Sequence, residues 1–228
     1  MSSRMNDQAK FVGRILAAAV LAMLLSGCVT ATVQQVRQTE TAMDADDSIV
    51  VMGRRNRPSQ GEAELDFIDC VSRNMGSGAN RVQVISEQAF MDAMFPWFEP
   101  RTAPLSTTDL PELLRQPMLA QRIREIGLKY LVWLEGGTKR TAQGGSLSCT
   151  LTPGGGGCFG FLSWESDSSY EASVWDAHTA KTAGRVSSDA AGTSYVPALV
   201  VPIPLIARVQ SSACVSLAEQ LKEFVQSS

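Results

Sequence analysis

The residues Lys129-Tyr130-Leu131-Val132-Trp133-Leu134-Glu135-Gly136 predict a central β-strand. Five apolar or aromatic side chains follow one another, and β-branched and aromatic types favour strands. A helical stripe of apolar residues precedes this strand, from about Pro111 to Ile126, and Pro117 interrupts it. Gly127 then supplies a C-terminal cap. The segment 111–136 therefore predicts a helix followed by a central strand.

A long hairpin is expected after the central strand. Residues Trp164–Ala177 alternate in polarity, which places Tyr170, Ala172 and Val174 on the buried face. Asp176–Lys181 has the composition of a turn, and Thr182–Ser188 returns as the partner strand.

The remaining segments add short strands and amphipathic helices. Ser48–Gly53 and Val82–Ile85 have the composition of short strands. Helices are expected over Gln60–Met75, from the cap Ser86 to Phe95, and over Ser212–Phe224. The order predicts an α/β (α+β) fold: a two-layer sandwich whose mixed sheet has about five strands, with three to four helices.

The N-terminal residues have the layout of a secretory signal peptide. Arg4, Lys10 and Arg14 precede the apolar run Ile15–Leu25. This run is shorter than the roughly 20 apolar residues that span a bilayer. It ends in Leu25-Ser26-Gly27-Cys28, which resembles the lipobox of bacterial lipoproteins, Leu-[Ala/Ser]-[Gly/Ala]-Cys, at all four positions. The alternative is an uncleaved anchor helix with a chance cysteine.

The lipobox resemblance implies an address. In bacterial lipoproteins the cysteine thiol receives a diacylglycerol, cleavage falls before the cysteine, and the new amine is acylated. We therefore expect residues 1–27 to be a signal peptide and Cys28 to carry lipid, commonly palmitate. Several acyl chains make such attachment stable. Val29 follows Cys28 where an Asp would retain a lipoprotein at the inner membrane, so the resemblance implies the outer membrane, facing the periplasm.

Composition limits the partners and the number of domains. The 228 residues include 20 basic and 23 acidic side chains, a net charge of −3. Loss of Arg4, Lys10, Arg14 and Asp7 with the signal peptide changes this to −5. An acidic chain argues against a nucleic-acid partner and against electrostatic attachment to anionic lipid headgroups. Residues 28–47 are polar and predict a tether, and residues 48–228 predict a single periplasmic domain.

The cysteines indicate disulfides rather than a metal site. If Cys28 is acylated, four cysteines remain in an exported chain, where disulfides persist. Cys149 and Cys158 bracket a glycine-rich segment and are the easiest to join, which leaves Cys70 and Cys214 either paired or buried as free thiols. Zinc spacing is absent, and Gly154–Gly157 lacks the Gly-Lys-[Ser/Thr] of a phosphate loop. We expect no metal and no cofactor, and a disulfide-tied, mobile hairpin loop over Gly144–Gly160.

Two apolar segments are candidates for contact with a protein partner. The run Pro197–Ala207 contains three prolines, which exclude a central strand or a helix. Its side chains form either an exposed contact site or a loop laid over the core. Trp97 and Phe98 lie between prolines, where they either cover an edge of the core or contact a partner. The contact candidates are Trp97, Phe98, Leu199, Val200, Ile203 and Leu205.

The sequence contains no set of residues that indicates an enzyme. His178 is the only histidine and lies in the expected turn, without a neighbouring nucleophile or orienting partner. The carboxylates around Gln60–Met75 have the spacing of a solvated helix face, with acidic residues in the first turns. We expect a protein that is not an enzyme.

Three segments resemble the periplasmic domain shared by the curli-secretion lipoprotein, the N-terminal domain of TolB and the lipoprotein activators of peptidoglycan synthases. Ile49–Met52 resembles the opening strand of that family. Ile126–Val132 resembles its "A-x-x-l-G-a-d-y-l-v" segment, with Lys129 in place of an acidic residue. Val174–Lys181 resembles its "l-v-D-a-x-T-G-k" hairpin, with Ala180 in place of glycine. The resemblance covers roughly residues 48–226 and implies no required catalytic residue.

These observations favour one functional hypothesis over two others. The first is a lipid-anchored, non-enzymatic envelope protein that binds another envelope protein or acts as an assembly module. The second is an oligomeric outer-membrane secretion or transport component, like the curli relative. That relative adds membrane-crossing hairpins, and neither Gly144–Gly160 nor Pro197–Ala207 alternates over the ~9–11 residues that a spanning strand requires. The third, a periplasmic hydrolase, lacks a visible nucleophile and base.

Overall fold

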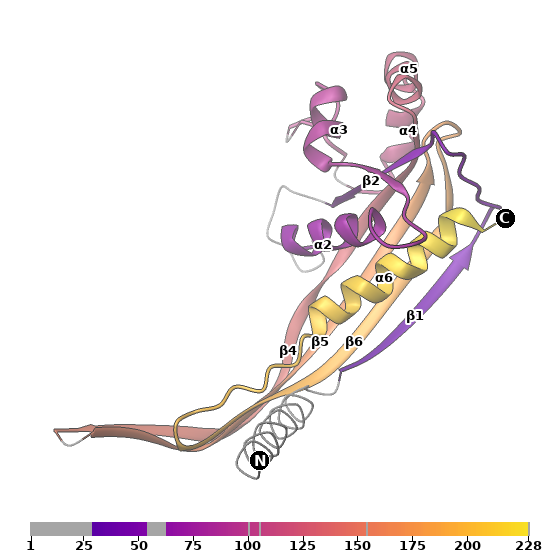
Figure 1. The fold of residues 1–228 in the computed structure, drawn as a ribbon. Coiled ribbons are helices and arrows are strands. Elements are labelled where there is room, and N and C mark those ends of the chain that lie inside the picture. The colour runs from indigo at the N-terminus through magenta and orange to yellow at the C-terminus, as the bar shows by residue number, and fades with distance from the viewer. Residues whose placement is uncertain (1–28, 54–62, 100, 105, 154, 228) are drawn as a thin grey trace, which may run out of the picture. The chain divides into compact units, whose positions relative to one another are not determined.

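The computed structural model describes residues 29–53, 63–99, 101–104, 106–153 and 155–227. The expected signal peptide and Cys28 lie outside the described residues. The strands and helices follow in chain order (Figure 1): β1 (Val29–Arg37), β2 (Ser48–Gly53), α2 (Leu65–Met75), β3 (Gln83–Ile85), α3 (Glu87–Ala93), α4 (Leu110–Leu114), α5 (Pro117–Glu125), β4 (Leu128–Thr152), β5 (Gly155–Asp176), β6 (Lys181–Val200) and α6 (Val209–Gln226).

The strands form one mixed sheet in the order β1-β6-β5-β4-β2-β3. Strand β2 pairs in parallel with both β3 and β4, with Val50 opposite Ile85 and Leu131. Strands β4, β5 and β6 are neighbours joined by short turns, and such turns connect antiparallel strands. The α+β class is therefore confirmed, and the described part of the sheet has six strands where about five were expected.

Helices cover both faces of the sheet at β2, whereas a two-layer sandwich was expected. All six residues of β2 are buried. Because successive side chains of a strand point to opposite faces, Ile49 and Val51 need cover on one side, and Val50 and Met52 on the other. The continuous apolar composition of β2 is the physical reason for the additional layer.

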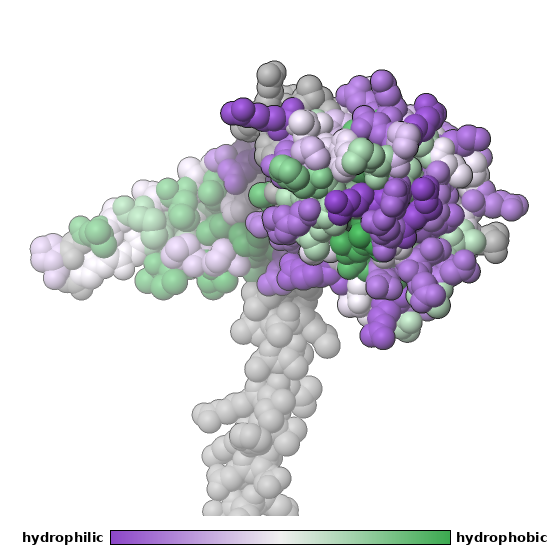
Figure 2. All heavy atoms as spheres, turned by 90° about the horizontal axis from the view of Figure 1, so that it is seen from above, coloured by the Kyte–Doolittle hydropathy of each residue, from purple (hydrophilic) through white to green (hydrophobic). Residues whose placement is uncertain are grey.

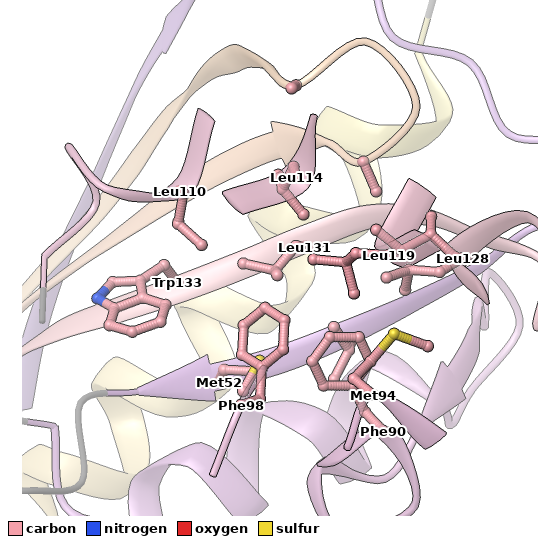
Figure 3. Close-up of a cluster of buried hydrophobic side chains, with 14 residues drawn as sticks. Met52, Phe90, Met94, Phe98, Leu110, Leu114, Leu119, Leu128, Leu131 and Trp133 are labelled. Carbon is pink, nitrogen blue, oxygen red and sulfur yellow. The ribbon is translucent and has the colours of Figure 1, made fainter. Parts of the chain in front are cut away.

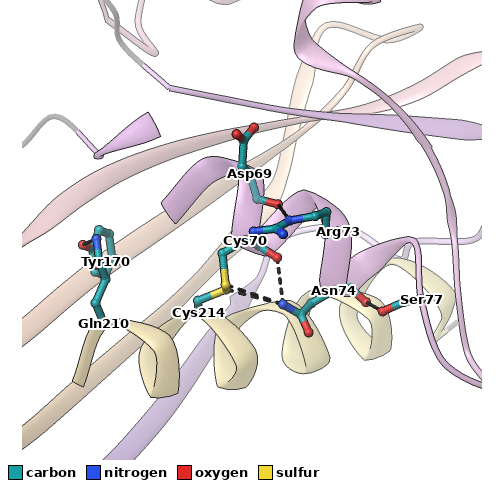
Figure 4. The surroundings of a disulfide bond; sticks show 8 residues. All are labelled: Asp69, Cys70, Arg73, Asn74, Ser77, Tyr170, Gln210 and Cys214. Carbon is teal, nitrogen blue, oxygen red and sulfur yellow. Dashed lines mark hydrogen bonds between the residues drawn. A yellow bond between two sulfur atoms is a disulfide. The ribbon is translucent and has the colours of Figure 1, made fainter. Parts of the chain in front are cut away.

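Helices α2 and α6 cover the first face (Figure 1). Phe67 of α2 stacks on Tyr170 of β5, with 3.4 Å between ring centroids. Cys70 and Cys214 form a disulfide that joins α2 to α6, so the pairing left open by the sequence is present (Figure 4). The Asn74 side-chain amide donates to the Cys70 carbonyl at 2.8 Å beside this disulfide.

Helices α3, α4 and α5 cover the second face. Their apolar side chains meet alternate residues of β2 and β4 in a buried cluster (Figure 3). The helix signals in the sequence are confirmed here: the Ser86 hydroxyl accepts from the Ala89 backbone N–H, and the break at Pro117 separates α4 from α5. The cluster contains Val50, Met52, Phe90, Met94, Phe98, Leu110, Leu114, Leu119, Ile123, Leu128, Leu131, Trp133, Ala177 and Ala180.

Strand β1 corrects the expected tether over residues 28–47. Val29–Arg37 pairs with β6 at the edge of the sheet, and Thr41 is buried. The low hydrophobicity of this segment indicates little burial, but an edge strand is held by backbone hydrogen bonds and tolerates polar side chains. Gly184 of β6 permits this packing, because a Cβ at that position would collide with the Val36 carbonyl oxygen and the Phe224 ring.

The described residues divide into two compact units. The first, which we call the α/β unit, comprises Thr30–Lys139, Asp167–Ala191 and Val209–Ser228. The second, which we call the hairpin unit, contains Val29, Arg140–Ser166 and Gly192–Arg208. The strands expected to end at Gly136 and to begin at Trp164 are longer, so most of Gly144–Gly160 is strand rather than loop.

Candidate functional site: an uncharged hairpin unit

Most of the hairpin unit is formed by two segments of the sequence that carry no charge. Residues 141–164 and 190–207 contain no Asp, Glu, Lys, Arg or His, although the chain has 20 basic and 23 acidic residues. Charged residues border both segments: Arg140 and Glu165 enclose the first, and Asp189 and Arg208 enclose the second. Solvated protein surfaces normally intersperse charges of both signs, so this composition sets the unit apart.

Large apolar side chains are exposed on the hairpin unit. Among the described residues, nine of the fourteen exposed large hydrophobic side chains belong to it. Figure 2 shows this apolar surface in green and a mostly hydrophilic visible face over the α/β unit. We call these nine residues the apolar set: Leu151 (93% exposed), Phe159 (58%), Phe161 (47%), Tyr195 (39%), Leu199 (86%), Val200 (53%), Val201 (67%), Ile203 (55%) and Ile206 (48%).

The hairpin formed by β4 and β5 is tied by the disulfide Cys149–Cys158, which was expected from the sequence. Phe161 of β5 contacts Tyr195 of β6, with 5.8 Å between ring centroids. Alternate residues of a strand share a face, so Phe159 lies on the side of Phe161, and Leu199 lies on the side of Tyr195. The two strands therefore present one continuous apolar face.

The proline-rich run folds back along the end of β6. Tyr195 and Leu205 exchange backbone hydrogen bonds of 2.9 and 2.7 Å, and the Ile203 N–H donates to the Pro197 carbonyl at 3.0 Å. The Ala207 N–H donates to the Ser194 hydroxyl at 3.0 Å. These bonds hold the run in place while its apolar side chains stay exposed.

The two alternatives for Pro197–Ala207 are thus resolved in favour of an exposed surface. Leu199, Val200 and Ile203 are exposed, as a contact site requires, whereas Leu205 is only half-buried. At the border of the unit, the Arg140 guanidinium lies over the ring of Trp164, and its Cζ is 5.1 Å from the ring centroid.

The other pair of contact candidates separates into two roles. Phe98 is 2% exposed and packs against Phe90 in the core, with 4.8 Å between ring centroids, so its assignment as a partner contact is wrong. Two prolines nearby indicated a loop, but the loop folds inward at this residue. Trp97 is half-buried, and its Nε1 donates to Gln116 Oε1 at 2.8 Å.

Trp97 also lines a shallow hollow on the α/β unit. The hollow has a volume of about 610 Å³. Phe95 and Met118 are exposed at its rim, at 63% and 71%. Its remaining lining residues are Pro96, Gln121, Arg122 and Glu125. Aromatic residues, Met and Arg are enriched at protein interfaces, so this hollow is a smaller second contact candidate.

Tyr170, Glu64 and Thr138 form a hydrogen-bonded cluster inside the α/β unit that holds elements of the fold together. The Tyr170 hydroxyl donates to Glu64 Oε2 at 2.5 Å and lies 3.1 Å from the Thr138 hydroxyl. Burial and the hydrogen bond to Glu64 raise the pKa of Tyr170. The Tyr170 phenol therefore stays protonated and acts as a donor that fixes the first turn of α2 against β5.

Asp176 stabilises the turn after β5 by an ion pair and by backbone hydrogen bonds. Asp176 Oδ1 accepts from the backbone N–H groups of His178 and Thr179, and Asp176 Oδ2 lies 3.1 Å from Lys129 Nζ. Ala180 has a φ of 53°, a conformation that glycine prefers. Exposed His178 thus lies in a structural turn, which begins and ends where the sequence indicated.

Asp176→Asn is expected to lower the free energy of unfolding by about 1 kcal/mol at pH 7, because it removes the partly exposed ion pair with Lys129. Partial burial of Asp176 raises the pKa of its carboxyl, but the Thr179 N–H and Lys129 outweigh burial and lower it. The unfolded chain then binds more protons, so the parent loses this stabilisation as the pH falls below about 4.

Urea denaturation of the parent and of Asp176→Asn between pH 3 and pH 7 measures this effect. The difference between the two proteins should shrink towards pH 3. A difference that stays constant over this range would contradict a contribution from the Asp176 charge. Lys181→Gln, in the same turn, is a control that changes charge without touching the pair.

The described residues contain neither a membrane-spanning helix nor a metal-binding cluster. None of the helices there is long and apolar enough to cross a membrane. In the same part of the chain, His, Cys, Asp and Glu side chains nowhere gather in a group of three that a metal ion requires.

Comparison with known proteins gives only distant structural similarity. No family model matches the chain, and no curated protein matches it. Among solved structures, it is similar to a PelC dodecamer from Paraburkholderia phytofirmans, with 12% identity and a TM-score of 0.38 over 87% of this chain and 99% of that chain. A single-substitution variant of that dodecamer has 12% identity and a TM-score of 0.39, over 87% and 100% of the two chains. Similarity at this level carries no conclusion about the function of this chain.

Proposed function

We propose that this protein is a lipid-anchored, non-enzymatic module of the bacterial outer membrane that faces the periplasm and works by contact. Its hairpin unit is the surface that binds another component of the envelope. The observation that carries the proposal is the exposed apolar set on the uncharged segments 141–164 and 190–207. Monomeric soluble proteins seldom expose large contiguous apolar patches unless these bind something.

The construction of the hairpin unit supports a binding role. The disulfide Cys149–Cys158 ties its β4–β5 hairpin, and the hydrogen bonds of Tyr195 with Leu205 fix the returning chain. A surface ordered before binding loses less conformational entropy when it engages a partner. The apolar set is therefore held in a geometry suited to a lasting contact.

The lipid anchor is the second part of the proposal. The lipobox resemblance assigns acylation to Cys28, one residue before the start of β1. The intact mass of the protein purified from a bacterial outer membrane tests the anchor. We expect a chain that begins at Cys28 and carries acyl groups, and an unmodified chain beginning at Met1 would contradict it.

The interior polar groups support a non-enzymatic module. Glu64 and Tyr170 are engaged with each other, and Asp176 is engaged with Lys129 and with the turn backbone. Each of these groups holds elements of the fold together. Titratable groups with a chemical role are instead usually presented to a cleft where a substrate can reach them.

The binding role is tested by chemical crosslinking of the lipidated protein in its own membrane. We expect the variant Leu199→Asp/Ile203→Asp to lose most of the crosslinked products, because each aspartate places a charge in the apolar contact. The control is Leu65→Asp/Val215→Asp, which changes exposed apolar residues of α2 and α6. Equal product from both variants and the parent would contradict a binding role for the hairpin unit.

A further inference from the structure

We infer that the hairpin unit contacts lipid: its apolar set enters the surface of the membrane leaflet that holds the lipid of Cys28. The inference rests on the proposed function, because it needs the anchor, and it names the component that the same surface binds. Three observations carry it: the place where the anchor joins the sheet, the absence of charge from residues 141–164 and 190–207, and the residues at the borders of the unit.

The anchor joins the chain beside the hairpin unit. Thr30 and Thr32 of β1 lie with Asp189, Ala190 and Ala191 of β6 around one surface hollow. Further along the same pair of strands, the Gln38 N–H donates to the Ala183 carbonyl at 2.9 Å. Partner numbers thus rise along β1 as they fall along β6, which makes the pair antiparallel.

Continuing this register brings the start of β1 to the hairpin unit. Val29 then falls beside Gly192, and both belong to that unit. Cys28 is bonded to Val29, so its Cα lies about 3.8 Å from that of Val29. No flexible linker therefore separates the acyl chains on Cys28 from the hairpin unit. Attachment of the lipid therefore keeps the apolar set within reach of the leaflet.

The chemistry of the unit suits the boundary between headgroups and acyl chains. Charged side chains are costly in a bilayer, and residues 141–164 and 190–207 contain none. Their polar side chains are mainly hydroxyls of Ser and Thr, which such a boundary tolerates better than charges. Surface-bound segments bury their apolar face by about 5–10 Å, a depth that a few residues of a strand cover.

The borders of the unit have the residues that anchor proteins at membrane interfaces. Trp164 has an apolar ring with a polar edge, the property that enriches Trp at this depth. Arg140 lies over the Trp164 ring, and Arg208 follows the second uncharged segment. Long cationic side chains at such positions extend towards headgroups.

Two features favour lipid over a protein partner for this surface. A protein interface has a polar rim and about one hydrogen bond per 100–200 Å², and its partner must match the shape of the surface. The apolar set instead spreads over β4, β5, β6 and the returning chain, and the segments 141–164 and 190–207 that carry it have no charged side chain to pair with a protein partner. The net negative charge of the mature chain also gives no electrostatic attraction to anionic lipids. Apolar contact therefore supplies the affinity of this surface for the membrane, in addition to the covalent lipid.

The lipidated protein is reconstituted in phosphatidylethanolamine–phosphatidylglycerol vesicles that contain a phosphatidylcholine with a diazirine in its acyl chain. After illumination, lipid adducts are mapped by mass spectrometry. The unsubstituted protein should carry adducts in 141–164 and 190–207 at about ten times their frequency in 110–126 of the α/β unit, because burial of one large apolar side chain alone corresponds to at least that factor.

Substitution separates lipid contact from mere proximity to the anchor. Leu199→Asp/Ile203→Asp should lose most adducts in 190–207, whereas Leu65→Asp/Val215→Asp should keep the parent pattern. Parental resistance of both variants to trypsin shows that they are folded, and the map of the unsubstituted protein decides the question without them. Equal adduct frequency in the hairpin unit and in 110–126 would overturn the inference.

The result also distinguishes failure of this inference from failure of the proposed function. If the hairpin unit lacks lipid adducts in vesicles but Leu199→Asp/Ile203→Asp still loses crosslinked proteins in its native membrane, the surface binds protein. The lipid assignment then fails, while the binding role stands. If the hairpin unit lacks lipid adducts in vesicles and Leu199→Asp/Ile203→Asp also keeps the crosslinked products of the parent in the native membrane, the two proposals fail together.

Discussion

Replacing Cys70 and Cys214 with alanine is expected to lower the free energy of unfolding by about 4–5 kcal/mol. The disulfide joins residues 144 positions apart. Closing so long a loop removes much conformational entropy from the unfolded chain, and the effect grows with loop length. The bond also links α2 to α6, the two helices that cover one face of the sheet, and Cys214 is fully buried.

Removal of Cys149 and Cys158 is the matched comparison. These residues are nine positions apart, so the same reasoning gives about 2.5 kcal/mol. Urea denaturation followed by far-ultraviolet circular dichroism measures both double variants against the parent. Equal losses for the two, or a larger loss for Cys149→Ala/Cys158→Ala, would contradict the role assigned to the α2–α6 link.

Phe98→Ala is expected to lower the free energy of unfolding by about 3–5 kcal/mol, the usual cost of truncating a buried aromatic side chain. Phe98 is 2% exposed and contacts Phe90 edge to face between α3 and the sheet. The substitution leaves a cavity in the cluster that fills the second face.

Trp97→Ala provides the control next in sequence. Trp97 is half-buried, and its hydrogen bond to Gln116 is exposed, so we expect a loss of about 1 kcal/mol. Thermal and urea denaturation of both variants separate the two roles. A loss for Phe98→Ala no greater than that for Trp97→Ala would show that Phe98 does not belong to the core.

The central part of the fold could be predicted because its signals are local and agree with one another. The apolar run within Lys129–Gly136 lies in β4, the composition of Asp176–Lys181 gives the turn between β5 and β6, and Ser86 begins α3. In each case the residue types of the segment and the burial of its side chains indicate the same secondary structure. The cysteine count likewise indicated disulfides, although only the fold decided that Cys70 pairs with Cys214.

The parts that could not be predicted depend on tertiary packing. Val29–Arg37 forms a strand because it pairs with the edge of β6. The hydrophobicity of the segment does not indicate that such an edge is present. Gly144–Gly160 has the composition of a loop, yet pairing with the neighbouring strand and the Cys149–Cys158 disulfide hold most of it in β4 and β5. Phe98 turns inward because α3 and the sheet leave space for it.

The candidate site was only half visible in the sequence. Leu199, Val200 and Ile203 were identified from the apolar run, but Phe159, Phe161 and Tyr195 were not. The signal that points to all six is the absence of charge from 141–164 and 190–207, two segments that are distant in sequence and adjacent through β5 and β6. Neither segment is unusual alone, and the strand order shows that they form one surface.

The measurement that most directly tests the contact role of the hairpin unit is photocrosslinking from single positions in the native outer membrane. Benzoylphenylalanine is placed at Ile203 of the hairpin unit or at Leu65 of α2, whose side chains are 55% and 58% exposed and are thus matched. We predict abundant adducts with an envelope component from position 203 and few from position 65. Equal yields at the two positions would contradict the proposal that the hairpin unit is the functional surface.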